Sequence, residues 1–236
     1  MKRSIRLGVV AALLFVVAAC ASTSQVSEQG VDFRPGQTRI ALMPLDINLY
    51  LLTAGGVLEP RADWTEAAEG HVRDAIENVK ASRKLELVAF NVESLPSGQQ
   101  QTMTQVVKLH SLVGNEILVQ RRIPELRPPT KEGPFDWSIG PHANAVGQLT
   151  GARYGLFVTM RDSYSSAGRV ALNLLTSVLF GISANGGQQL GYASLVDLET
   201  GQIVWFGTLL RGTGDLRSPE AAQAAVDQLF AGLPES

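Results

Sequence analysis

The chain has 236 residues, 45% of them hydrophobic, and its 20 Lys and Arg against 22 Asp and Glu give a formal net charge of −2. This balance argues against a nucleic-acid binder, which would carry a basic stripe. The only cysteine is Cys20, which excludes an internal disulfide and a thiolate metal site. The fold must therefore rest on a hydrophobic core, and the length suits one large domain or two small ones.

The N-terminus has the layout of a secretory signal peptide. Lys2, Arg3 and Arg6 precede an apolar run over residues 7–19, which leads through small residues to Cys20. This run resembles the lipobox of bacterial lipoproteins, whose signal is cut just before the cysteine. The resemblance implies cleavage between Ala19 and Cys20, removal of residues 1–19, and a covalent diacylglycerol on the thiol with an acyl chain such as palmitate on the new amino terminus. The alternative is an ordinary signal peptide with a chance cysteine.

Acylation of Cys20 would anchor the chain to a bilayer, because two or three acyl chains bind far more firmly than one. The next residue is Ala21 rather than Asp. By resemblance to the enterobacterial sorting rule, this implies the outer membrane, with the protein facing the periplasm. Residues 20–36 are rich in Ser, Thr, Gln and Gly, which predicts a lipidated flexible tether. One periplasmic domain is then expected over residues 37–236.

The first half of this domain predicts a βαβ unit. Residues 38–46 are typical of a short strand ended by Pro44, and 48–60 of a loop broken at Gly55 and Gly56. From Asp63 onward apolar residues recur at helical spacing, and residues 85–90 predict a second strand. Strand, helix and strand at this spacing favour a parallel βαβ arrangement.

The second half predicts helices over residues 102–119 and 144–149 and a buried strand over 151–160. Two further strands, 190–198 and 202–210, flank a short turn in which Gly201 can take a left-handed conformation. Ser218 and Pro219 start a final helix. The pattern predicts the α/β class: one layered domain with helices packed on a mixed β-sheet, ending in a hairpin plus a helix.

Three segments, residues 38–46, 151–160 and 195–205, carry a resemblance to known proteins. Their order, with a Gly-Ala-Arg-Tyr strand and an Asp-x-x-Thr-Gly hairpin, is similar to a group of α/β domains of envelope lipoproteins. The group includes the curli secretion channel lipoprotein, the lipoprotein activators of peptidoglycan synthases and the N-terminal domain of the Tol-system periplasmic protein. The resemblance implies protein binding or pore formation rather than catalysis.

Residues 121–141 contain five prolines and form the longest irregular stretch, and such loops are often functional. Cations in it can meet an anionic surface, and two aromatic residues can dock. The candidate contacts are Arg121, Arg122, Arg127, Phe135 and Trp137. The alternative is a surface loop pinned by its two aromatic residues, because charge clusters usually form solvated faces.

Residues 163–187 form an apolar insertion between two predicted strands. Within it, residues 169–180 have a narrow polar stripe at every fourth position and a wide apolar face. One hypothesis is a surface that contacts the membrane, a second copy or a partner protein; the alternative is a helix covering the sheet. The candidate interaction residues are Arg169, Val170, Leu172, Leu174, Leu175, Val178, Leu179 and Phe180.

No motif predicts a catalytic or metal site. His71, His110 and His142 have no metal-ligand spacing, and residues 181–185 lack the final glycine of a nucleophile elbow. We therefore expect no enzyme, no metal and no cofactor other than the lipid on Cys20. The predicted function is a non-catalytic protein-binding or assembly module of the cell envelope. Its partners would be the bilayer, through acylated Cys20, and an envelope protein or a second copy, with no nucleic acid. The alternatives are a subunit of an oligomeric secretion channel and an envelope hydrolase whose site forms only on folding.

Overall fold

The computed structural model describes residues 24–34, 38–180, 187–212 and 214–234, and of residues 174–180 it describes the backbone alone. The predicted signal peptide, Cys20 and residues 181–185 lie outside the described residues.

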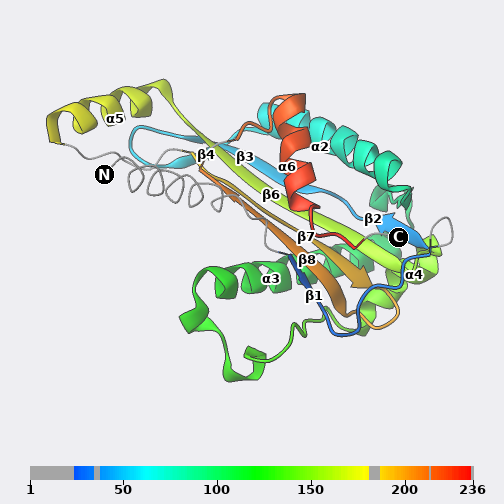
Figure 1. Cartoon of the computed structure of the whole chain (residues 1–236). Helices are drawn as coiled ribbons and strands as arrows, with labels where there is room; N and C mark the ends of the chain where they lie inside the picture. The colour runs from blue at the N-terminus through cyan, green and yellow to red at the C-terminus, as the bar shows by residue number, and fades with distance from the viewer. Residues whose placement is uncertain (1–23, 35–37, 181–186, 213, 235–236) are drawn as a thin grey trace, which may run out of the picture.

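Within the described residues, a mixed sheet of eight strands runs through the molecule, and Figure 1 shows its course. Its main path is β1 (Ser24–Val26), β8 (Ile203–Arg211), β7 (Gln189–Asp197), β6 (Tyr154–Ser165), β2 (Arg39–Leu42) and β5 (Glu86–Ala89). The long strand β6 pairs with β2 along its first part and with β3 (Asp46–Leu52) along the rest, and β3 forms a hairpin with β4 (Leu58–Pro60). Strands β2, β3, β5 and β6 pair in parallel, whereas β6, β7, β8 and β1 pair antiparallel. The predicted α/β class with a mixed sheet is confirmed.

Helices cover both faces of the sheet (Figure 1). Helices α2 (Ala62–Arg83) and α6 (Pro219–Leu229) pack on one face, and α3 (Ser97–Arg122) and α4 (Asn144–Thr150) pack on the other. Successive strand residues point to opposite faces, so that Leu156 joins the core under α2 and α6 while Phe157 joins the core under α3. Short 3₁₀ helices lie at Val92–Ser94, Pro124–Leu126, Pro129–Lys131 and Pro141–Ala143.

The local patterns at both ends of the domain are confirmed. Strand β2, helix α2 and strand β5 form the expected parallel unit, with Arg39 opposite Glu86. Gly201 has a φ of 78° in the β7–β8 turn. The Ser218 hydroxyl oxygen accepts a hydrogen bond of 3.3 Å from the backbone N–H of Ala221, which caps α6 as its sequence predicts.

The prediction of a flexible tether over residues 20–36 is wrong for residues that the structure describes. Strand β1 pairs with β8, and the Ser27 N–H donates to the Val204 carbonyl at 3.0 Å. Phe33 packs edge-on against Tyr154, with ring centroids 5.7 Å apart. The polar composition of residues 20–36 did not predict a strand. Strand β1 pairs through backbone hydrogen bonds to the edge of β8 and does not depend on an apolar side-chain pattern.

Two further segments differ from the predicted secondary structure. Residues 48–60, predicted as a loop, form the β3–β4 hairpin, in which Gly56 takes a φ of 84° and donates its N–H to the Thr53 carbonyl. Helix α3 extends to Arg122, so that the first two residues of the predicted irregular stretch 121–141 are helical. The prolines that follow start two of the short 3₁₀ helices, since proline fits the first turn of a helix.

Candidate functional site

Two elements extend past the body of the sheet at one end of the molecule: the β3–β4 hairpin and helix α5 (Ala167–Phe180) (Figure 1). We call the hairpin tip, residues 53–58, together with α5 the arm. The two parts are joined at their base, where the Ser166 N–H donates to the Leu52 carbonyl at 2.9 Å. The Ser166 hydroxyl also accepts a hydrogen bond from the Arg169 N–H at 3.2 Å, and so caps the start of α5.

Large apolar side chains of the arm face solvent. Val57 and Leu58 on the hairpin are 61% and 51% exposed, and Val170 and Leu172 on α5 are 55% and 45% exposed. The interpretation of residues 169–180 as a helix that covers the sheet does not fit these exposed side chains. The candidate side chains of Leu174, Leu175, Val178, Leu179 and Phe180 lie outside the described set. The arm therefore presents exposed apolar surface on an element that protrudes from the domain.

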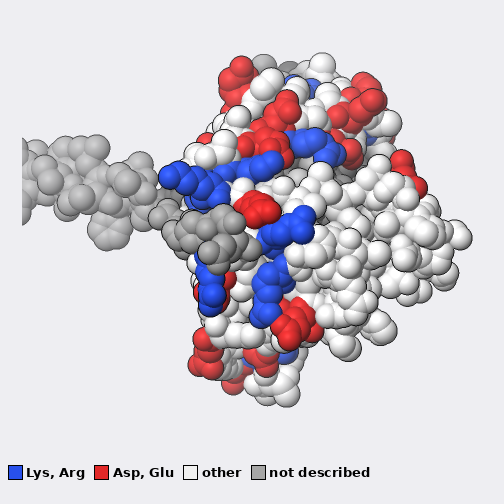
Figure 2. All heavy atoms as spheres, turned by 90° about the vertical axis from the view of Figure 1, so that its right-hand side faces the viewer, with Lys and Arg blue, Asp and Glu red and all other residues white. Residues whose placement is uncertain are grey.

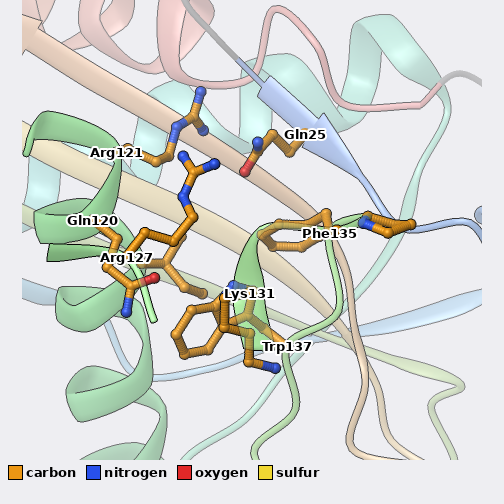
Figure 3. Close-up of a pocket in the computed structure, with 10 residues that line it drawn as sticks. Gln25, Gln120, Arg121, Arg127, Lys131, Phe135 and Trp137 are labelled. Atoms are coloured by element: carbon orange, nitrogen blue, oxygen red, sulfur yellow. The ribbon is translucent and has the colours of Figure 1, made fainter. Parts of the chain in front are cut away.

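A cationic pocket lies at the C-terminal end of α3 (Figure 3). It has a volume of about 40 Å³, and its labelled side chains come from α3, from the loop that follows it and from β1. The guanidinium groups of Arg121 and Arg127 point into the same space, with Gln25 of β1 nearby (Figure 3). Of the candidate contacts, the pocket brings together Arg121, Arg127, Phe135 and Trp137, whereas Arg122 does not line it.

The charges around this pocket are of one sign. Its described lining residues include Arg121, Arg127 and Lys131 and no Asp or Glu. The buried Nη1 of Arg121 has no hydrogen-bond partner among the described protein atoms. Burial lowers the pKa of the Arg121 guanidinium, and repulsion from Arg127 lowers it further. The protein thus holds two guanidinium groups close together, and the Arg121 guanidinium has one nitrogen without a hydrogen-bond acceptor among the described protein atoms.

Backbone contacts hold the loop that closes the pocket. Ile203 donates its N–H to the Trp137 carbonyl at 2.7 Å, and Ile139 donates to the Gly201 carbonyl at 2.9 Å. Phe135 packs against buried Phe206, with ring centroids 6.3 Å apart. The Lys131 ammonium lies 4.7 Å from the centroid of the Trp137 ring. The loop is therefore fixed to the β7–β8 hairpin, and its side chains form a shaped wall.

The end of the molecule away from the arm carries charges of both signs on its surface. Lys and Arg side chains there are interspersed with Asp and Glu (Figure 2). Arg153 of the chain just before β6 makes an ion pair of 2.7 Å with Asp197, and Arg39 makes one of 3.3 Å with Glu86. Against that background, a group of cations without a carboxylate in its lining marks the pocket as a candidate site.

The core contains a serine–histidine pair that no sequence motif predicted. His110 of α3 and Ser194 of β7 lie 2.5 Å apart, Nε2 to Oγ, and are 1% and 0% exposed. The imidazole stacks on Phe157 with ring centroids 4.0 Å apart, and burial lowers its pKa to about 3. The geometry is that of a nucleophile and base, but no substrate can reach a pair that the core encloses. It instead cross-links α3 to the sheet.

A second buried polar group is centred on Asp162 of β6. One carboxylate oxygen accepts hydrogen bonds from the Tyr164 hydroxyl at 2.5 Å, the Gln189 amide at 2.9 Å and the Leu216 N–H at 3.3 Å. Burial raises the pKa of Asp162, and burial together with the neighbouring carboxylate raises that of Tyr164. Arg217 lies 3.8 Å from the centroid of the Tyr164 ring. These contacts tie β6, β7 and the segment before α6 together.

The described residues contain no group of three or more His, Cys, Asp or Glu able to hold a metal ion. Within the same residues, no helix has the length and apolarity needed to cross a membrane. His71 instead bonds through Nδ1 to the Leu216 carbonyl at 3.0 Å, and His142 lies exposed in a short 3₁₀ helix.

Comparison with models of protein families finds no match, and none of the curated proteins matches the sequence. Solved structures similar to this chain include the PelC dodecamer from Paraburkholderia phytofirmans, at 12% identity and a TM-score of 0.39 over 91% of this chain and 99% of that one. Another is the LpoB C-terminal domain from Salmonella enterica, at 14% identity and a TM-score of 0.31 over 78% of this chain and 87% of that one. We therefore derive the proposed function from the residues of this chain.

Proposed function

We propose that the chain is a lipoprotein of the outer membrane, anchored through acylated Cys20, and that its periplasmic domain is a non-catalytic assembly module. The observation that carries this proposal is the arm, which presents exposed apolar side chains on elements that protrude from the sheet. His110 and Asp162, whose pKa values are shifted, are buried in contacts that join core elements, which assigns them a structural role.

We propose that the arm packs against a second copy of this chain. Arg169 is the only charged residue of α5, and residues 170–180 contain none. Helices that lie on anionic membranes usually carry Lys and Arg on their polar face, so α5 is better suited to packing against protein. The small residues Gly168 and Ala171, three positions apart on α5, allow the backbone of a facing helix to approach closely. Repeated contacts of this kind would form the ring of an oligomeric channel, which is the second candidate function.

Substitution of the arm tests self-association. We expect the detergent-extracted lipoprotein to form a defined oligomer by size exclusion with light scattering, and Val170→Asp to reduce it to smaller species, because a carboxylate buried in an apolar contact is strongly unfavourable. Leu112→Asp is the matched control, since Leu112 is an apolar residue of α3 that is 69% exposed outside the arm. A wild-type monomer, or equal effects of the two substitutions, would contradict self-association through the arm.

Substitution of Cys20 tests the anchor. Cys20→Ala removes the only thiol. With residues 1–19 replaced by an ordinary cleavable signal peptide, we expect this variant to move from the membrane fraction to the soluble periplasmic fraction, with the mass of the acyl groups lost. Ala21→Ser keeps the thiol and should leave the chain in the membrane fraction. Unchanged fractionation of Cys20→Ala would show that the chain is held at the membrane by something other than lipid on this residue.

A further inference from the structure

The cationic pocket lies close in sequence to the proposed lipid. Gln25 lines the pocket from β1 and follows Cys20 by five residues. A fully extended chain spans at most about 3.6 Å per residue, so the acylated residue lies within about 18 Å of Gln25. Strand β1 is itself hydrogen-bonded to β8, and a flexible tether therefore cannot carry the pocket far from the anchor. This step rests on the lipid attachment of the proposed function.

The electrostatics of the pocket favour an anion. Burial lowers the pKa of Arg121, and repulsion from Arg127 lowers it further. None of the described carboxylates forms an ion pair with Arg121, Arg127 or Lys131. The negative end of the α3 dipole offsets part of this charge, but it leaves the buried Nη1 of Arg121 without an acceptor. A bound anion would supply the acceptor and relieve the repulsion.

The size and shape of the pocket restrict which anion it takes. Its volume of about 40 Å³ is enough for a few water-sized groups. Guanidinium groups match the spacing of phosphate oxygens and bind them through two parallel hydrogen bonds. Gln25 and Gln120 add amide groups to a lining that is mainly polar, which suits a phosphate group rather than an apolar ligand.

We propose that this pocket binds a phosphate group, and that the group belongs to the headgroup of an anionic phospholipid at the surface to which Cys20 attaches the chain. Arg121 and Arg127 bind the phosphate oxygens, and Lys131 adds positive charge at the mouth. The acyl chains hold the protein at the membrane, and the pocket sets which side of the domain faces it.

The test uses the mature chain without residues 1–19 and carrying Cys20→Ala, so that binding through the pocket is measured without the acyl anchor and without the apolar signal. Sedimentation with phosphatidylglycerol vesicles should capture the protein, whereas phosphatidylcholine vesicles should capture much less. Arg121→Gln and Arg127→Gln should each weaken binding to the anionic vesicles by about tenfold or more, because each removes a charged hydrogen-bond donor. Arg122→Gln removes the same charge from the next position of α3, outside the pocket, and should weaken binding by about fivefold at most.

Several results would overturn the proposal. Equal losses for Arg122→Gln and Arg121→Gln would show binding by surface charge alone. Equal capture by the two vesicle types, or no capture, would exclude an anionic headgroup as the ligand. If inorganic phosphate shifts the fluorescence of Trp137 while the vesicles bind nothing, the pocket takes a soluble phosphate compound instead. Urea unfolding checks that the variants fold, and Arg127, which is exposed on the loop, provides a substitution that leaves the core intact.

The lipid anchor and the headgroup site can be tested separately. Vesicle binding by the chain carrying Cys20→Ala does not depend on acylation, and membrane fractionation of the wild-type chain does not depend on the pocket. If vesicle binding is lost while the wild-type chain stays in the membrane fraction, the chain is an anchored assembly module without a headgroup site.

Discussion

The folded state should lose about 2 kcal/mol of stability through His110 when the pH falls from 7 to 5. Burial lowers the pKa of this imidazole from 6.5 to about 3, so the folded chain keeps His110 neutral over a range in which the unfolded chain protonates it. The unfolded state then binds more protons, and the free energy of unfolding falls as the pH drops below about 6.5, until it levels off near pH 3. One pKa unit corresponds to about 1.4 kcal/mol, and pH 5 lies about 1.5 units below the ordinary value.

Urea unfolding of the wild type and of His110→Leu at pH 7, 6 and 5 measures this effect. The variant lacks the titrating group, so its free energy of unfolding should change less with pH than that of the wild type, by about 2 kcal/mol at pH 5. At pH 7 the variant should also be less stable by about 1–3 kcal/mol, because Ser194 loses its buried partner. Parallel pH dependences in the two proteins would show that His110 is not held neutral in the core.

Replacing Gly201 by alanine should destabilise the fold by about 3 kcal/mol or more. Gly201 has a φ of 78° in the β7–β8 turn, and a Cβ added there would lie 2.0 Å from the carbonyl oxygen of Gly140. The left-handed backbone costs an alanine about 1–2 kcal/mol, and forcing apart two packed backbone segments costs about 1–3 kcal/mol more. Because Ile139 donates to the Gly201 carbonyl, the loop that closes the cationic pocket should shift as well.

Gly56→Ala separates these two contributions. Gly56 has a φ of 84°, but the nearest heavy atom to its added Cβ is Nη1 of Arg169 at 3.7 Å, an ordinary contact distance. This substitution should therefore cost about 1–2 kcal/mol, the backbone contribution alone. Urea denaturation of both variants gives the comparison. Equal losses of stability would mean that the β7–β8 turn and the loop at Gly140 do not pack as closely as the structure places them.

Local sequence patterns determined most of the elements of this fold. Helical periodicity located α2, α3 and α4, and the Ser218–Pro219 pair marked the start of α6. The short turn at Gly201 joined two strands of matching length. Each of these depends on contacts between residues close in sequence, such as caps, turns and the spacing of apolar side chains, so that a single chain is enough to predict them. The lipobox is likewise a local motif, and it is the source of the proposed anchor.

Only the tertiary structure decided what those elements bring together. Strand β1 forms because β8 has an edge free to pair with it. The three residues of β1, Ser-Gln-Val, show no pattern that predicts a strand. His110 and Ser194 are 84 residues apart in sequence, and neither position belongs to a motif. Arg121 and Arg122 are equivalent in the sequence, yet the end of α3 directs Arg121 into a pocket completed by Gln25 and excludes Arg122 from it. Pairing between distant segments depends on which surfaces the packed layers leave open, and that is a property of the whole fold rather than of any one stretch of it.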